Sequence, residues 1–189
     1  MTADVPILIS HLETYLGQIQ AGAPLSEGIQ GVVFPDQPVT GATAFTTLGL
    51  SNHLLAQERG PRARLEFLFA CRDAHLDQFE PLSVLADVTD QALAAHAAPP
   101  RGTVIGPGGP FFAGSQMEAL YCTGPVYFQD GLSTFAGFAE PFLIVWLVPI
   151  APIEAAFVQS HGWSRFETLL TEAQPDLLDM LRPAIVDHA

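Results

Sequence analysis

The sequence predicts an α+β (mixed α/β) fold, in which helices flank one central, largely antiparallel mixed sheet. Three patterns lead to this fold class: one unbroken apolar run, several segments that alternate with a period of two residues, and several segments with helical spacing. The apolar run, residues 142–148, is too short for an ordinary helix and suits a strand covered on both faces. Pro141 and Pro149 flank it. Pro149 should end the strand, because proline has no N–H for the ladder.

The first part of the chain predicts one helix and three strands. Apolar residues recur at spacings of three, four and seven over residues 4–19, which indicates an amphipathic helix, capped by Asp4 and packed on the sheet. Residues 28–34, 39–50 and 64–71 predict strands separated by turn-rich loops. Short loops between neighbouring strands favour antiparallel pairing.

The middle of the chain predicts a second helix and further strands. The helix should begin near Pro81, with an inner face marked by apolar and small residues at helical spacing. These residues are Leu82, Leu85, Ala86, Thr89, Leu93 and His96. Short strands are expected at residues 103–105, 116–122 and 126–128.

Two short helices are predicted after the apolar run. Pro152 suits the first turn of one helix, whose apolar face would be Ile153, Ala156 and Phe157. The second would start with a capping box at residues 164–167, Ser-Arg-Phe-Glu, and end before Pro175.

Length and composition indicate one domain over residues 1–189 with a well-covered core, since the chain is 49% hydrophobic and 14% charged. The formal charge of −13 includes no lysine, which disfavours nucleic-acid binding and favours a basic partner. Solubility alone is the other explanation of this charge. No segment is long enough to span a membrane and no signal peptide is recognisable, so a cytoplasmic location is expected.

Several blocks of the chain resemble the Suppressor of fused-like (SUFU) domain family. They are residues 47–51, Thr-Leu-Gly-Leu-Ser, and residues 64–69, Arg-Leu-Glu-Phe-Leu-Phe, followed by a C-terminal group. The C-terminal group comprises Val148-Pro149-Ile150, Glu154, His161-Gly162, the Phe-Glu-x-Leu-Leu helix and Asp179-x-x-Arg182-Pro183. The resemblance spans roughly residues 30 to 186 and implies a mixed sheet with helices packed around it.

The resemblance implies a non-enzymatic protein-binding module. Animal members of the family sequester a transcription factor, and stand-alone bacterial-type members are thought to include immunity proteins that neutralise toxins. The chain corresponds to the first domain of the animal arrangement only, and glycine and proline occupy residues 106–110, where animal members carry acidic peptide-binding residues. From the resemblance, the expected partner is a protein, and a basic toxin would fit the charge of the chain. Neither nucleic acid nor a membrane is expected as a partner.

The alternative is a small hydrolase or metal-dependent enzyme that uses polar loop residues. Asp73, His75 and Asp77 alternate as metal ligands would in an extended loop, and Ser51 with His53 invites a hydrolase interpretation. The sequence does not assemble a nucleophile, base and oxyanion hole, so we expect no catalytic residues, no metal site and no cofactor.

Aromatic residues in glycine-rich loops are the predicted partner-binding residues. They are Phe111, Phe112, Phe135 and Phe138. Loops carry function more often than cores do, and aromatic side chains dominate interface energies. Packing back onto the core is the alternative role. Cys71 and Cys122 end strand-like runs and are expected to be buried small hydrophobic residues.

Overall fold

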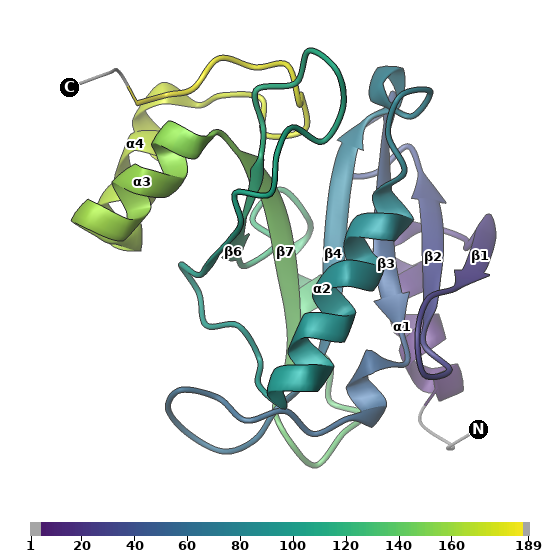
Figure 1. Ribbon diagram of the computed structural model, residues 1–189. Coiled ribbons are helices and arrows are strands. Elements are labelled where there is room, and N and C mark those ends of the chain that lie inside the picture. The colour runs from purple at the N-terminus through teal and green to yellow at the C-terminus, as the bar shows by residue number, and fades with distance from the viewer. Residues whose placement is uncertain (1–4, 187–189) are drawn as a thin grey trace.

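The computed structural model describes residues 5–186, and its centre is one seven-stranded sheet (Figure 1). The strand order is β1-β2-β3-β4-β7-β6-β5, and every neighbouring pair is antiparallel except β4 and β7, which are parallel. The predicted α+β fold with a largely antiparallel mixed sheet is therefore confirmed. The strands are β1 (Ala21–Pro24), β2 (Gln30–Pro35), β3 (Ala42–Leu48), β4 (Arg64–Arg72), β5 (Val104–Ile105), β6 (Ala119–Thr123) and β7 (Phe142–Ile150).

Helices cover both faces of this sheet. The α-helices are α1 (Val5–Leu16), α2 (Pro81–Ala95), α3 (Pro152–His161) and α4 (Trp163–Ala173). The short 3₁₀ helices are η1 (Leu50–Asn52), η2 (Asp73–His75) and η3 (Asp130–Ser133). Figure 1 shows α2 across one face, α1 on the opposite face, and α3 with α4 beside the β6 end. No helix within residues 5–186 is long and apolar enough to cross a membrane.

The apolar run forms β7, and its side chains alternate between two cores. Ile144 and Trp146 pack with α1 residues such as Leu8, whereas Val145 and Leu147 pack on the α2 side. Trp146 is fully buried. The predicted burial of this strand on both faces is confirmed, because an unbroken apolar run has no polar side chain to present to solvent.

The prediction that Pro149 ends the strand is wrong, because β7 continues to Ile150, where it pairs with β6. A residue in a strand points its N–H and C=O to the same edge. The Pro149 carbonyl accepts a hydrogen bond from Arg182 Nη2 at 3.2 Å and therefore points away from β6. The Pro149 nitrogen lies on the same edge and also faces away from β6. β4 pairs with β7 only as far as Trp146, so no strand lies opposite the Pro149 nitrogen on that edge. The missing N–H therefore costs no ladder hydrogen bond.

The predicted amphipathic helix at the N-terminus is present as α1. Leu8, Leu12 and Leu16 are buried against the sheet. The proposed Asp4 cap lies outside the described residues. Edge strand β1 was not predicted, because its residues Ala-Gly-Ala-Pro carry no alternating apolar pattern.

Two predictions in the middle of the chain are wrong. Residues 126–128 form a turn rather than a strand, since Phe128 N–H donates to the Pro125 carbonyl at 3.0 Å and Phe128 packs on Trp146. In α2 the buried face is rotated from the predicted one. Leu85 and Thr89 are buried as expected, but His96 is exposed at the helix end. The buried residues of α2 are Pro81, Val84, Leu85, Val88, Thr89 and Ala92.

The helix after β7 starts at Pro152 as predicted, but its buried face is Glu154, Ala155 and Val158, while Ala156 is exposed. Of the predicted face, Ile153 and Phe157 are partly buried against the core, so the prediction is wrong for Ala156. A buried ion pair turns Glu154 inward instead.

The predicted capping box of the last helix is not formed. The helix starts at Trp163, so Ser164 lies within its first turn, and the Glu167 carboxylate bonds to other elements.

Candidate functional site

A groove opens where β7 has a neighbouring strand on one side only. β4 pairs with the first half of β7, from Arg64 opposite Phe142 to Leu68 opposite Trp146. β6 pairs with the second half only, starting at Thr123 opposite Trp146. The stretch 142–145 therefore has no strand on the β6 side, and a cavity of about 550 Å³ lies there. We call this cavity the β7 groove.

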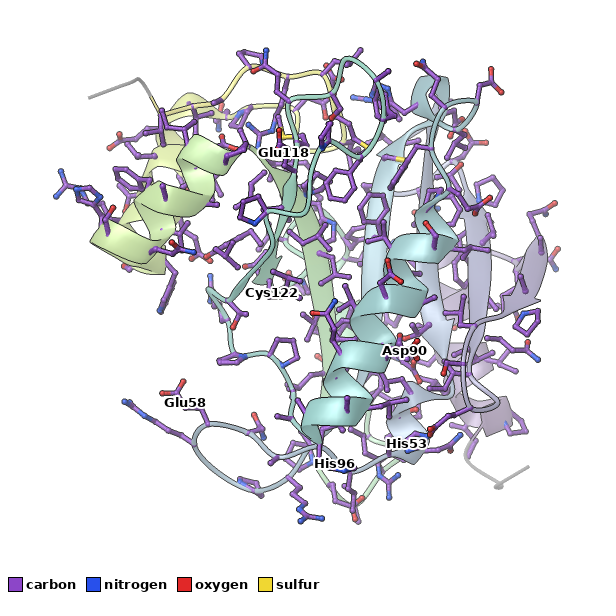
Figure 2. The ribbon with its side chains drawn as sticks, viewed as in Figure 1. His53, Glu58, Asp90, His96, Glu118 and Cys122 are labelled. Carbon is purple, nitrogen blue, oxygen red and sulfur yellow. The ribbon has the colours of Figure 1, made fainter. Side chains whose placement is uncertain are left out.

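The walls of the β7 groove come from segments far apart in sequence. They are the loop 57–59, the segment 98–101 after α2, the end of β6 at residues 122–124, and Trp163 at the start of α4. Figure 2 labels Cys122 beside β7 and Glu58 on the loop below it. Pro99 and Pro100 carry no N–H, so these two residues have no donor with which to pair with β7 across the groove.

A second, smaller cavity of about 330 Å³ adjoins the β7 groove, and Arg101 and Thr123 line both. Glu167 organises the boundary between them. Its carboxylate accepts hydrogen bonds from Arg101 Nε at 2.9 Å and Nη2 at 2.6 Å, from Tyr121 Oη at 2.9 Å and from Thr123 Oγ1 at 3.1 Å. Burial, with the hydrogen bond to Glu167, raises the pKa of Tyr121, so its hydroxyl stays a donor at neutral pH.

Exposed apolar side chains gather around these two cavities. Trp163 is 42% exposed and lines the β7 groove, with the Arg101 guanidinium 5.0 Å from its ring centre. Val126 and Tyr127, 66% and 41% exposed, line the smaller cavity. Exposed aromatic and apolar side chains at the rim of a concave surface are typical of interaction sites.

The smaller cavity is also lined by Trp146. Within the described residues, its buried indole N–H has no hydrogen-bond partner. Burying such a donor without a partner costs free energy, so the indole N–H lowers stability at this position.

The four phenylalanines predicted to bind a partner lie in two separate places. Phe112 is buried and stacks on His75, and Phe111 is half-buried against Phe79. Phe135 and Phe138 are half-buried, contact each other edge to face and pack on the α1 side of the sheet. None of them lines the β7 groove. Their partner-binding role stays a prediction.

The candidate hydrolase pair is not brought together. Ser51 is buried and its Oγ donates to Glu66 Oε1 at 2.6 Å, and no hydrogen bond to His53 is found in the described part of the chain. Glu66 is fully buried. It also accepts from Thr47 Oγ1 at 2.6 Å and from the Gly49 N–H at 3.0 Å. Burial raises the pKa of Glu66, and these hydrogen bonds lower it in part.

The candidate metal ligands are engaged elsewhere. Asp73 accepts from Thr43 Oγ1 at 2.7 Å, and buried His75 has its Nε2 3.0 Å from Asp179 Oδ1. Asp77 is exposed. No cluster of His, Cys, Asp and Glu among residues 5–186 could hold a metal ion.

Cys71 and Cys122 are free and buried, as predicted, and burial raises the pKa of each thiol to about 12. Neither is therefore a reactive thiolate near neutral pH.

The residues around the β7 groove were not predicted from sequence. Pro99, Pro100, Arg101 and Trp163 were not among the site residues predicted from the sequence. Two consecutive prolines beside a strand-rich region were an available signal, because such a segment cannot take part in a ladder.

Both the sequence and the fold match known proteins. The family model described as Suppressor of fused protein (SUFU) matches residues 26–183. No sequence among curated proteins matches significantly. A SUFU (suppressor of fused protein) homologue from Neisseria gonorrhoeae FA 1090 has a TM-score of 0.73 and 18% identity, with 100% of both chains covered. A chain of the Sufu-Fu complex has a TM-score of 0.71 and 12% identity, covering 96% of this chain and 92% of that one. At these identities the structures support the fold alone.

Proposed function

Because the chain belongs to the Suppressor of fused (SUFU) family, we propose that it is a non-enzymatic protein-binding module whose partner docks at the β7 groove and the adjoining cavity. Residues 1–189 would act as a single domain. The observation that carries this proposal is the set of exposed apolar side chains, Trp163, Val126 and Tyr127, around two adjoining cavities. The solved Sufu-Fu complex supports it by analogy, since that protein of similar fold is in complex with another protein.

The partner is a basic protein. The formal charge of −13 creates a negative field that speeds the approach of a positively charged surface. Neutralisation of a basic toxin, as expected of bacterial-type members of the family, is the specific role that we propose. The four predicted phenylalanines would add secondary contacts, with Phe111 and Phe138 the half-buried candidates.

Capture with the immobilised chain tests the proposed function. The captured protein, once purified, should bind one to one and lose affinity with Trp163→Ala, because Trp163 is an exposed aromatic residue at the groove rim. Val39→Ala is the matched control, since Val39 is 45% exposed but does not line either cavity. Co-expression of the chain should then restore growth to cells that express the captured protein. A chain that turns over a small substrate without any partner would contradict the proposal.

A further inference from the structure

The open edge of β7 carries backbone groups that no strand of the described chain pairs. The Arg64 N–H donates to the Pro141 carbonyl at 2.9 Å, which sets the phase of the parallel ladder between β4 and β7. Backbone groups of successive residues point to opposite edges of a strand. Phe142 and Ile144 therefore point their N–H and C=O groups away from β4, and Ile144 lines the β7 groove. Trp146, two residues further, has β6 on this side.

Two features keep this edge open. β6 stops pairing at Thr123, and Gly124 follows at the groove wall. On the far wall, Pro99 and Pro100 have no N–H to donate. Natural sheets usually shield an exposed edge, because a row of unpaired backbone groups can accept another chain.

We propose that a short extended segment of the basic partner protein adds as a strand to residues 142–145 of β7, in line with β6. This inference rests on the proposed function and names how the partner is held. Unpaired N–H and C=O groups along a strand are matched by another backbone in extended conformation, which is the mode of β-strand addition. Four residues give a contact on the order of 13 Å long.

Charge selects the partner segment over a second copy of the chain. Two copies would each carry −13 and repel each other, whereas a segment flanked by lysine or arginine is attracted. Glu58 on the groove wall offers a carboxylate to such a side chain, although Arg59 lies beside it. Arg101, which also lines the groove, is already paired with Glu167. Ala98, Pro99 and Trp163 offer apolar contacts to alternate side chains of the added strand.

Hydrogen–deuterium exchange on the full chain tests the open edge. Amides of Phe142 and Ile144 should exchange much faster than those of Leu143 and Val145, which point toward β4. Equal protection along residues 142–145 would mean that the edge is not open and would overturn the proposal.

A phage-displayed library of random peptides, panned on the full chain, tests the occupant. Selected peptides should carry lysine or arginine and should protect the amides of Phe142 and Ile144 from exchange. Gly124→Leu should weaken their binding by roughly tenfold or more, because its side chain would project into open space at the groove wall. The matched control is Gly108→Leu. Gly108 is equally open but lines a different cavity, so this change should leave binding unaltered.

Other outcomes would overturn the strand addition, and they show whether the proposed protein-binding function fails with it or stands without it. Peptides that are weakened by Trp163→Ala but not by Gly124→Leu would show a binding module that uses side-chain contacts without strand pairing. Self-association in sedimentation that Gly124→Leu abolishes would make a second copy the occupant. A library that yields no binder, while the captured protein still binds, would overturn the strand and preserve the binding function. If neither binds, both proposals fail.

Discussion

Arg182 and Glu154 form a buried bidentate ion pair, with Nη1 to Oε1 at 2.7 Å and Nη2 to Oε2 at 2.9 Å. Both side chains are almost completely shielded from solvent. Glu154 also accepts the N–H of Ala151 at 2.8 Å and that of Ile185 at 3.0 Å. The pair joins the C-terminal segment to the start of α3 and the end of β7. Both residues belong to the SUFU-like blocks, so those blocks mark a structural element of the fold.

Removing one member of this pair should destabilise the protein strongly. Arg182→Met would leave the Glu154 carboxylate buried without its cation, at a cost of about 3–5 kcal/mol. Urea denaturation measures the change. Arg72→Met is the control. It breaks a partly exposed ion pair with Asp176 and should cost about 1 kcal/mol or less. Equal effects of the two changes would contradict the structural role of the buried pair.

Glu66 should make stability fall as pH rises. Burial raises its pKa above the ordinary value of 4.5, so between that value and its own pKa the folded state keeps a proton that the unfolded state has lost. Unfolding free energy therefore falls over this window, at up to about 1.4 kcal/mol per pH unit. The side chain of Glu66→Gln is neutral at every pH, so this group adds no pH dependence to the stability of the variant. The unfolding free energy of the parent minus that of the variant should therefore decrease from pH 4.5 upward. A difference that grows with pH would contradict this assignment.

The elements that the sequence predicted correctly are those whose pattern lies within a few neighbouring residues. β4 and β7 were predicted as strands, because residues 64–71 alternate with a period of two and residues 142–148 are apolar throughout. The helical face of α2 was misplaced, because apolar residues surround more of the helix than one stripe and only the sheet decides which of them are buried. The buried partners of Glu66 lie 15–19 residues away, a distance at which no periodic pattern connects them.

The candidate site could not be predicted from patterns among neighbouring residues. The β7 groove results from the unequal lengths of β6 and β7 and from the parallel pairing of β4 with β7, which joins segments more than 70 residues apart. Pairing of that kind is set by the whole sheet. The loop phenylalanines were the strongest aromatic signal in the sequence, yet Phe112 packs on His75 in the core, whereas Trp163 inside a helix is exposed.

Trp146 should contribute strongly to stability through its ring and not through its indole N–H. Trp146→Ala would empty a fully buried site at the centre of β7 and should cost about 3–5 kcal/mol. Trp146→Phe keeps a ring and removes a donor that has no partner in the described residues, so its cost should be smaller, about 1–2 kcal/mol. Thermal or urea unfolding of both variants checks the order. A melting temperature of Trp146→Ala within a few degrees of the parent would contradict the central position of β7.

Association with the basic partner should depend on salt. Long-range attraction to a surface of charge −13 accelerates the encounter, and salt screens it over about 8–10 Å at physiological ionic strength. Added salt should therefore lower the association rate more than it raises the dissociation rate. Kinetic binding assays with the purified partner at two salt concentrations measure both rates.

Single substitutions should separate steering from anchoring at the same surface. Glu58→Gln removes one carboxylate from the groove wall and should lower the association rate, by about twofold, with little change in dissociation. Trp163→Ala removes an exposed aromatic side chain and should mainly raise the dissociation rate. Asp90→Asn, an exposed carboxylate on α2 that does not line the groove, is the control and should change association less than Glu58→Gln does. If binding is insensitive to salt, or if the captured partner is itself acidic, charge does not steer the encounter, and shape and backbone pairing at the β7 groove must then account for partner choice.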